Sequence, residues 1–291
     1  MNIQRIYQNE FPPLLKEIPS LPQFLDVAGT IPPCTNKQLC VVGSRKYSLY
    51  GMECCDKLMN GLRGYPITIV SGLAIGIDSI AHRAALNARL ATIAFPGSGL
   101  SPDVLYPSFH RILAEEIIHS GGCLMSPFER GFASTRWTFP ARNRLMAGIS
   151  HATLVIEARK GSGSLITTDF ATDFNRDILA VPGPIDSDLS YGPHMLIKRG
   201  AIPVTSSEDI LEALGFELPE VNNNLLQKIN FELLSPNEKL VATHLESPIR
   251  RDDLTRITHL SISEMTSILS DLELRGLITE RDGVIRRNFA I

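Results

Sequence analysis

Short apolar runs alternate with segments of helical spacing over residues 37–215. Polar residues do not alternate with apolar ones inside the runs, which is typical of parallel strands covered on both faces. Most runs lead through a turn rich in glycine or proline into an amphipathic segment, and this order favours a doubly wound α/β fold. The predicted strands are 39–42, 67–70, 91–95, 123–126, 152–156 and 178–181, and the clearest helices are 50–62, a segment ending at Ala88, and 108–119.

The two flanks of this region have a different texture. Residues 1–36 are rich in proline, so we predict an irregular lead-in with one short helix, packed on the domain formed by residues 37–215. Residues 216–232 include the polar, turn-prone stretch Glu217–Asn224, and they are predicted to form a linker. The chain is therefore expected to continue into a separate second domain.

Residues 233–291 show three helical segments followed by two short strands that turn at Asp282-Gly283. This order predicts a small winged-helix domain. The helical segments are 236–245, 252–258 and 261–274. In a duplex-binding winged helix the last of them would enter the major groove, but here it carries three acidic residues and no basic one. Because acids and phosphates repel each other, we expect this domain to contact a protein more readily than duplex DNA.

The composition is that of an ordinary globular protein, with 44% hydrophobic and 20% charged residues among 291. Since the formal net charge is −3, any binding of nucleic acid must come from a local basic patch. The five cysteines form no C-x-x-C pair, which favours free thiols in a reducing cytoplasm. No apolar run reaches the roughly 18 residues of a membrane span. We expect a cytoplasmic protein with no membrane partner.

A basic patch of that kind occurs in residues 135–168. This stretch combines five cationic side chains with a single acid, Glu157, and with the aromatic residues Trp137 and Phe139. Cations for phosphates and exposed rings for bases are what single-stranded nucleic acid requires. The stretch therefore predicts binding of a single strand. The cations are Arg136, Arg142, Arg144, Arg159 and Lys160.

Three segments are predicted to hold phosphates at one edge of the sheet. Gly43-Ser44-Arg45 and the turn 160–164 both follow strands, and the carboxyl ends of parallel strands meet where such folds bind ligands. The third segment is Arg142-Asn143-Arg144. Pro140 suits the first turn of a helix, so Arg142 and Asn143 are expected in the exposed first turns of that helix. The alternative is that the arginines of this segment pair with Glu157 or Asp169. Phe139 is expected to stack on a base. The residues predicted in this way are Gly43, Ser44, Arg45, Phe139, Arg142, Asn143, Arg144, Lys160, Ser162 and Gly163.

Sequence motifs for catalysis and cofactors are missing. The glycines do not follow G-x-G-x-x-G or G-x-x-x-x-G-K-[ST], and Ser162 has no evident histidine and carboxylate partners. The turn 71–78 can serve either helix packing, with Asp78 as a cap, or ligand binding, and both readings stay open. His82 is expected to hydrogen-bond to Asp78, and His151 to cap the helix before it. We predict no catalysis, no cofactor and no metal.

Taken together, these residues resemble the DprA/Smf family of DNA-processing proteins. The resemblance runs from Val42 to Ala201 in ordered blocks, which makes it far more specific than any single glycine motif. The main blocks are V-G-S-R at 42–45, S-G-L-A-I-G-I-D-S-I-A-H at 71–82, T-I-A-F-P-G-S-G-L at 92–100, F-P-A-R-N-R at 139–144, E-A-R-K-G-S-G-S-L-I-T-T at 157–168 and A-V-P-G-P at 180–184.

The resemblance implies an extended Rossmann-like sheet, mainly parallel, that binds single-stranded DNA. It also implies a homodimer without catalysis that protects incoming DNA and loads the RecA recombinase onto it in natural transformation and recombination. At matching motif positions, Arg45, Arg136 and Phe139 would contact the DNA. The sequence departs from the family pattern at Ser101-Pro102, which lengthens a loop, and at Ser126-Pro127, which replaces the usual serine-glutamate.

An enzyme of the related lysine-decarboxylase-like fold is the alternative. Such phosphoribohydrolases release bases from nucleoside monophosphates and carry the signature P-G-G-x-G-T-x-x-E. The corresponding turn here reads G-S-G-S-L-I-T-T-D, with Thr168 and Asp169 where the catalytic glutamate is expected, so the acid is missing or shortened. Release of free base from nucleotides would favour the enzyme over the binding protein.

Overall fold

The protein, seen here as a computed structural model, forms two compact units, 1–217 and 218–291. The described residues are 2–217, 234–245, 248–281 and 283–287. Most of the predicted linker, residues 218–232, lies outside them, as does Asp282 of the predicted turn.

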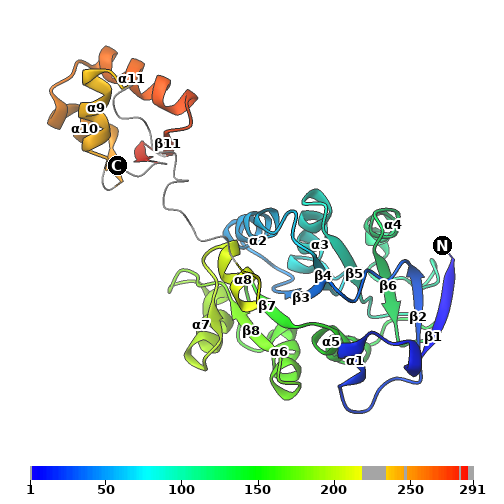
Figure 1. The fold of residues 1–291 in the computed structure, drawn as a ribbon. Helices are drawn as coiled ribbons and strands as arrows, with labels where there is room; N and C mark the ends of the chain where they lie inside the picture. Colours follow the sequence, from blue (N-terminus) through cyan, green and yellow to red (C-terminus); the bar gives the residue numbers. More distant parts are fainter. Residues whose placement is uncertain (1, 218–233, 246–247, 282, 288–291) are drawn as a thin grey trace. The chain divides into compact units, whose positions relative to one another are not determined.

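Nine strands form a single sheet in the first unit (Figure 1). They are β1 (Ile3–Tyr7), β2 (Phe24–Gly29), β3 (Lys37–Val42), β4 (Ile67–Ser71), β5 (Ala91–Ala94), β6 (Cys123–Ser126), β7 (Ala152–Val155), β8 (Asp177–Ala180) and β9 (Ile202–Pro203). Their spatial order is β1-β2-β6-β5-β4-β3-β7-β8-β9. From β6 to β9 in this spatial order, all neighbouring strands pair in parallel. At the other edge, β1 pairs with β2 and β2 pairs with β6 in antiparallel orientation.

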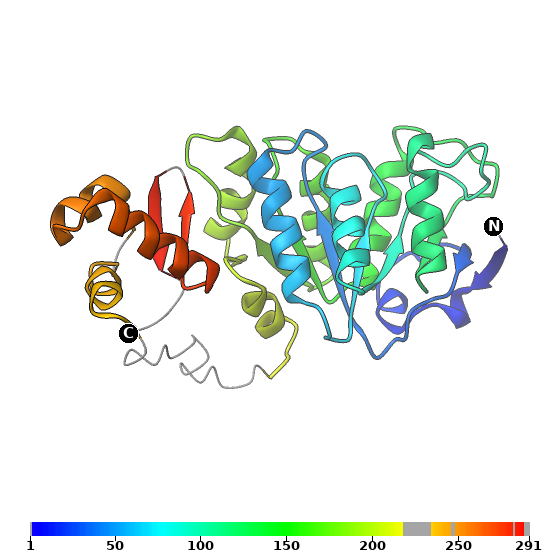
Figure 2. The same ribbon diagram turned by 90° about the horizontal axis from the view of Figure 1, so that it is seen from above.

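Helices cover both faces of this sheet. They are α1 (Pro13–Lys16), α2 (Leu49–Gly61), α3 (Ile77–Asn87), α4 (Arg111–His119), α5 (Thr138–Ile149), α6 (Gly163–Asp173), α7 (Tyr191–Lys198) and α8 (Ser207–Ala213), with short 3-10 turns at Gln8–Glu10, Ser108–His110 and Asp188–Ser190. One layer holds α2, α3 and α4 side by side, and the other holds α1, α5 and α6 (Figures 1 and 2). Burial on both faces explains why every residue of β4 is buried and apolar or hydrogen-bonded.

The doubly wound, mainly parallel α/β fold predicted from the sequence is confirmed. All six predicted strands exist within one or two residues of their expected limits. The helix predicted at 108–119 begins as a 3-10 turn before continuing as α4.

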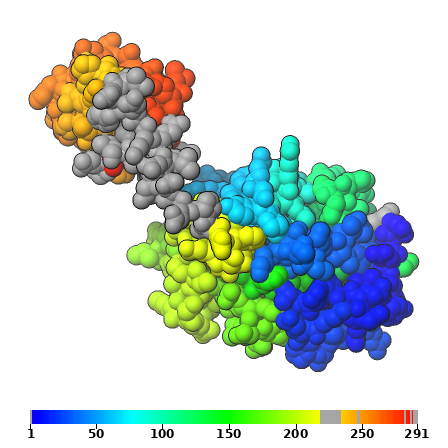
Figure 3. Space-filling view, viewed as in Figure 1, coloured from blue at the N-terminus to red at the C-terminus, as the bar shows by residue number. Residues whose placement is uncertain are grey.

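The N-terminal segment differs from its prediction, because it contributes two strands to the sheet as well as the short helix α1. Arg5 and Asp26 face each other across β1 and β2 and form an ion pair at 2.8 Å between Nε and Oδ1, with Asp26 fully buried. A charged residue in the middle of β2 obscures the apolar pattern by which a buried strand is recognised. The segment packs on the body of the first unit as one continuous surface (Figure 3).

The second unit is a winged helix. It contains α9 (Pro236–Thr243), α10 (Arg251–Thr258) and α11 (Ile262–Leu274), with the strands β10 (Ile249–Arg250), β11 (Ile278–Arg281) and β12 (Val284–Arg287) in the order β10-β12-β11. Three helices and the final hairpin were predicted, but the two-residue β10 is too short to leave a sequence pattern. Leu254, Met265, Leu269 and Ile285 contribute to a separate apolar core.

Candidate nucleic-acid interface

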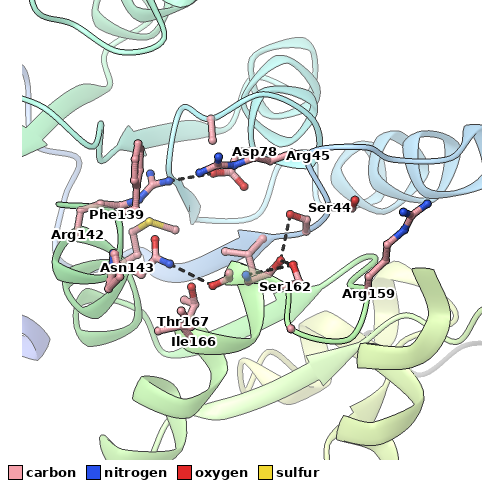
Figure 4. A pocket seen from close by; sticks show the side chains of 18 of the residues that line it. Ser44, Arg45, Asp78, Phe139, Arg142, Asn143, Arg159, Ser162, Ile166 and Thr167 are labelled. Carbon is pink, nitrogen blue, oxygen red and sulfur yellow. Dashed lines mark hydrogen bonds and ion pairs between the residues drawn. The ribbon is translucent and has the colours of Figure 1, made fainter. Parts of the chain in front are cut away.

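A pocket of the first unit, called the main pocket below, lies where the direction of the sheet's connections changes. β3 pairs with β4 on one side and with β7 on the other, and the chain leaves β3 toward α2 but leaves β7 toward α6, on the opposite face. A crevice opens at such a switch point, beyond the carboxyl ends of the strands. The cavity here measures about 500 Å³ and is lined by residues from the segments 42–46, 139–146 and 159–167, with Ala74 and Asp78 (Figure 4).

The loop after β3 is a tight turn that directs two cations outward. Ser44 Oγ donates to the Lys46 carbonyl at 2.7 Å and accepts from the Lys46 amide at 3.0 Å. Gly43 lies against α3, where a Cβ would come within 2.6 Å of the Ile77 side chain. This close approach leaves no room for a side chain at position 43. The next two cations in the loop, Arg45 and Lys46, are exposed at the edge of the pocket.

The loop after β7 presents the amino end of α6 to the pocket. Ser162 is the N-cap of this helix, and its Oγ accepts from the Ser164 amide at 3.4 Å. Ser164 Oγ donates to the Gly43 carbonyl at 3.1 Å, which connects this loop to the one after β3. A Cβ at Gly161 or Gly163 would meet no atom within 4 Å. The open space at this helix amino end suits an anionic group.

Phe139 places an aromatic ring under a cation at the pocket edge. The Arg45 guanidinium carbon lies 5.1 Å from the centroid of the Phe139 ring, within the range of a cation–π contact. Tyr106 also contacts the half-buried ring, edge-on at 5.8 Å between centroids. Gly97 packs against the Phe139 ring so closely that a Cβ there would lie 2.6 Å from it. The ring is therefore held in place by its surroundings.

Arg142 does not lie exposed in the first turns of its helix, and this expectation is wrong. Its side chain is only 4% exposed. It donates to the carbonyls of Gly72 and Phe95 and forms an ion pair with Asp78 at 3.6 Å. The two carbonyls lie just beyond the ends of β4 and β5, outside the hydrogen-bonded part of the sheet. Because buried carbonyls need a hydrogen-bond donor, the buried guanidinium serves as their donor. The partner is thus Asp78, rather than Glu157 or Asp169.

Burial dominates the electrostatics of this pair. It raises the pKa of Asp78, an effect that Arg142 opposes, and it lowers the pKa of Arg142, which Asp78 opposes. Backbone amides of Gly72 and Ala74 also donate to the Asp78 carboxyl group and favour its charged form. Asp78 lies in the first turn of α3, so it holds the turn 71–78 in shape from inside. The pair is a structural support beneath the pocket.

The remaining predicted side chains are divided between the pocket and other surfaces. Asn143 is buried and donates to the Gly163 carbonyl at 3.3 Å, joining α5 to α6. Arg144 points elsewhere, donating to the Ser20 carbonyl at 3.0 Å. Arg136 is exposed but does not line the pocket, whereas the exposed Lys160 does. The predicted residues that line the pocket are Gly43, Ser44, Arg45, Phe139, Arg142, Asn143, Lys160, Ser162 and Gly163.

Two cations of the pocket were not among the predicted site residues. Arg159 belongs to the basic patch noted in the sequence, and Lys46 directly follows Arg45; both are exposed and line the pocket. The position of Lys46 in the loop after β3, next to Arg45, could have indicated that it lines the pocket. Glu157, the acid among these cations, forms no ion pair with any of them in the described part of the chain, and its carboxylate accepts hydrogen bonds from the amide and the hydroxyl of Ser48 at 2.9 and 2.5 Å.

Two histidine expectations are also wrong. His82 Nδ1 lies 2.7 Å from Thr92 Oγ1 and is not bonded to Asp78. His151 Nδ1 accepts from the Gln38 amide of β3 at 3.0 Å, so it joins the end of α5 to the sheet rather than capping the helix. Both contacts cross between elements that are distant in sequence.

The described residues contain neither a metal-binding cluster nor a membrane-spanning helix. No group of three or more His, Cys, Asp or Glu side chains there is placed to hold a metal ion. In the same residues no helix has both the length and the apolar character needed to cross a membrane.

Comparison with known proteins identifies the family of this chain. The family model described as DNA recombination-mediator protein A matches residues 2–215, and the DprA winged helix domain matches residues 232–283. The chain belongs to this family of DNA-processing proteins. Protein Smf of Escherichia coli is 37% identical over 94% of this chain and 74% of its own length. DNA processing protein DprA of Streptococcus pneumoniae is 41% identical over 69% and 70%.

Solved structures of family members have the same fold. That of DprA from Streptococcus pneumoniae aligns with a TM-score of 0.67 and 38% identity, covering 75% of both chains. A structure of DNA processing protein A from Helicobacter pylori, concerned with that protein's single-stranded DNA binding, aligns with a TM-score of 0.64 and 24% identity. It covers 73% of this chain and 95% of that one. The family and the winged-helix assignment from the sequence are thus confirmed.

Proposed function

We propose that this chain binds single-stranded DNA along the carboxyl edge of its sheet. The observation that carries the proposal is the Arg45 guanidinium over the Phe139 ring at the edge of the main pocket. A cation beside an aromatic face can hold a phosphate and stack the neighbouring base, which is the combination that unpaired strands need. In duplex DNA the base faces are covered by their neighbours and are not available to a ring.

The charges around the pocket support the same reading. Arg45, Lys46, Arg159 and Lys160 are exposed around it, while the Glu157 carboxylate is engaged by Ser48. The amino end of α6 adds backbone N–H donors for a second phosphate. This local positive surface overcomes a slightly acidic chain. Arg136, exposed outside the pocket, would extend the contact along the strand.

Family membership supports the biological setting that we propose. The Helicobacter pylori relative is studied for its binding of single-stranded DNA, and members carry the name DNA processing protein. We infer that this chain acts in the cytoplasm without catalysis, protects incoming DNA and loads the RecA recombinase onto it in transformation and recombination. As a homodimer it would present two pockets to one strand, and binding would tighten through effective concentration.

Salt-dependent binding of a short single strand tests the proposal. Arg45→Ala is expected to weaken binding uniformly across sequences and to lower the slope of log affinity against log salt by roughly 0.7, the value for one phosphate contact on a single strand. Arg136→Ala is expected to behave in the same way. Arg144→Ala is the matched control, because Arg144 is an arginine of α5 that donates to the Ser20 carbonyl and does not line the pocket. Unchanged slopes for both site variants would refute the proposal.

The alternative enzymatic function receives less support from the geometry. Thr168 is buried and donates its hydroxyl to the Leu165 carbonyl within α6, and Asp169 lines a different, smaller pocket. No carboxylate other than Asp78, which is paired with Arg142, lines the main pocket within the described residues. Incubation with nucleoside monophosphates is expected to release no free base above the rate without protein. Release that depends on Asp169 would establish the hydrolase instead.

A further inference from the structure

A second, smaller cavity adjoins the main pocket and shares two of its residues. It measures about 190 Å³, and Arg45 and Ala74 line both cavities. Its other lining residues come from the turn 71–78 and from the loop that leads into α4. They are Ile75, Tyr106, Pro107, Ser108 and Phe109. Arg45 therefore stands between a cavity suited to phosphate and a cavity of different character.

The second cavity is apolar and exposed. Ile75 is 42%, Tyr106 44% and Phe109 64% exposed, although residues of this size and kind are usually buried. Three such side chains around one hollow form a patch that water covers poorly, and patches of this kind on monomers are often functional. The only charge in the lining is the Arg45 guanidinium, and Ser108 supplies the one side-chain hydroxyl apart from that of Tyr106.

The walls of this cavity are held by hydrogen bonds to the core. The Tyr106 amide donates to the buried Ser98 Oγ at 3.1 Å. His110 Nδ1 lies 2.7 Å from the carbonyl of Leu73, which ties the loop of Phe109 to the turn that carries Ile75. The Phe109 ring also packs edge-on against the His110 ring at 4.5 Å between centroids. The hollow is thus preformed, and filling it costs little ordering.

We propose that this cavity receives an unpaired base of the DNA strand, next to the base that stacks on Phe139. The inference rests on the proposed function. A phosphate on Arg45 has one base on each side of it along the strand, and two aromatic surfaces adjoin Arg45, the Phe139 ring and the cavity of Tyr106 and Phe109. The Tyr106 ring contacts the Phe139 ring at 5.8 Å between centroids, so the two surfaces are continuous. An apolar hollow with few polar groups accepts the faces of all four bases, and the contact tolerates any sequence.

Removal of one base from the strand, combined with removal of one side chain, tests this site in the full chain. A short oligothymidine is scanned with a single abasic residue at each position, and affinity is measured for the wild type and for Phe109→Ala. In the wild type, one abasic position is expected to lower affinity about tenfold, a typical loss for one stacked base. Phe109→Ala is expected to bind the intact strand about tenfold more weakly than the wild type does. An abasic residue at that same position is expected to lower the affinity of Phe109→Ala no further. Ile75→Ser is expected to behave in the same way.

The controls separate this inference from the proposed function. Ile112→Ala removes a similarly exposed side chain on α4 outside the cavity, and it is expected to bind like the wild type. The salt slope is expected to stay unchanged in Phe109→Ala, because no phosphate contact is lost. If Phe109→Ala and Ile75→Ser both bind the intact strand as the wild type does, the base site is refuted while strand binding stands. If the wild type binds no single strand at all, both proposals fail.

Discussion

Arg142 of α5 and Asp78 of α3 form a buried ion pair, 3.6 Å apart, beneath the main pocket. They join elements from opposite faces of the sheet, and through the Gly72 and Phe95 carbonyls the same guanidinium holds the ends of β4 and β5. The pocket floor therefore depends on an ion pair that is almost fully buried. Its loss should affect folding before it affects binding.

Arg142→Ala is expected to lower the free energy of unfolding by about 3–5 kcal/mol, because it leaves the Asp78 carboxylate buried without its partner. Chemical denaturation with a circular dichroism readout measures this. Arg136→Ala, a change at an exposed arginine, is expected to stay within about 0.5 kcal/mol of the wild type. A loss for Arg142→Ala no larger than that of Arg136→Ala would mean that the pair contributes nothing to stability.

Gly97→Ala is expected to weaken strand binding without changing its salt dependence. A Cβ at this position would lie 2.6 Å from the Phe139 ring, so the ring must move from its place under Arg45. Stacking would be lost while the phosphate contacts remain. Quenching of a fluorescent base analogue reports the stacking, and filter binding at several salt concentrations reports the charge contacts. Full quenching in the variant would show that the Phe139 ring is not the stacking surface.

Stability is expected to fall on acidification partly because of His82. Burial lowers the pKa of His82 to about 3, well below the usual value near 6.5. Between these values the unfolded chain binds a proton that the folded chain does not, so stability is present above about pH 6.5 and is lost as the pH falls toward 3. This group can contribute at most about 1.4 kcal/mol per pH unit.

His82→Gln removes the titrating ring and keeps a polar side chain near Thr92. Urea denaturation of both proteins between pH 7 and pH 5 should give a shallower decline of stability for His82→Gln than for the wild type. The difference between the two profiles isolates His82 from the other acids and histidines of the chain. Parallel profiles would contradict a neutral, buried His82.

Competition between single-stranded and duplex oligonucleotides of equal length should favour the single strand clearly. The α11 helix, which a winged helix would place in the major groove, carries Glu264, Asp271 and Glu273. All three have partners within the second unit: Glu264 accepts from the Ser261 amide at 2.9 Å, Asp271 pairs with Arg275 at 2.9 Å, and Glu273 accepts from the Glu280 amide at 3.5 Å. Tighter binding to the duplex would point to the second unit as a DNA reader.

Local patterns were enough to predict most of the fold. β3 to β8 are short apolar runs whose side chains face helices on both sides of the sheet. Their apolar sequences therefore indicate directly that these strands are buried. The strand β2 escaped prediction because the buried Asp26 is neutralised by Arg5 on another strand. A sequence pattern cannot show such a partner, since the two residues meet only after the chain has folded.

The candidate site was predictable to the same extent. Glycine-rich turns after β3 and β7 had to meet at one edge, and they do, with Arg45, Lys160 and Ser162 around one pocket. The exposure of Arg142 was predicted wrongly, because a position in the first turns of a helix suggests an exposed side chain. Its ion-pair partner, Asp78, lies on a helix that covers the opposite face of the sheet. Lys46 was overlooked although it stands beside Arg45.

The hydrogen bond from Ser164 Oγ to the Gly43 carbonyl holds the loops after β3 and β7 at a fixed separation. If each loop takes one phosphate, the protein rather than the polymer sets the interval between them. A flexible single strand can adjust its backbone to that interval, whereas a stiff double helix arrives with an interval of its own. The distance between the two loops, which the Ser164 hydroxyl helps to fix, would then favour single-stranded over duplex DNA independently of base stacking.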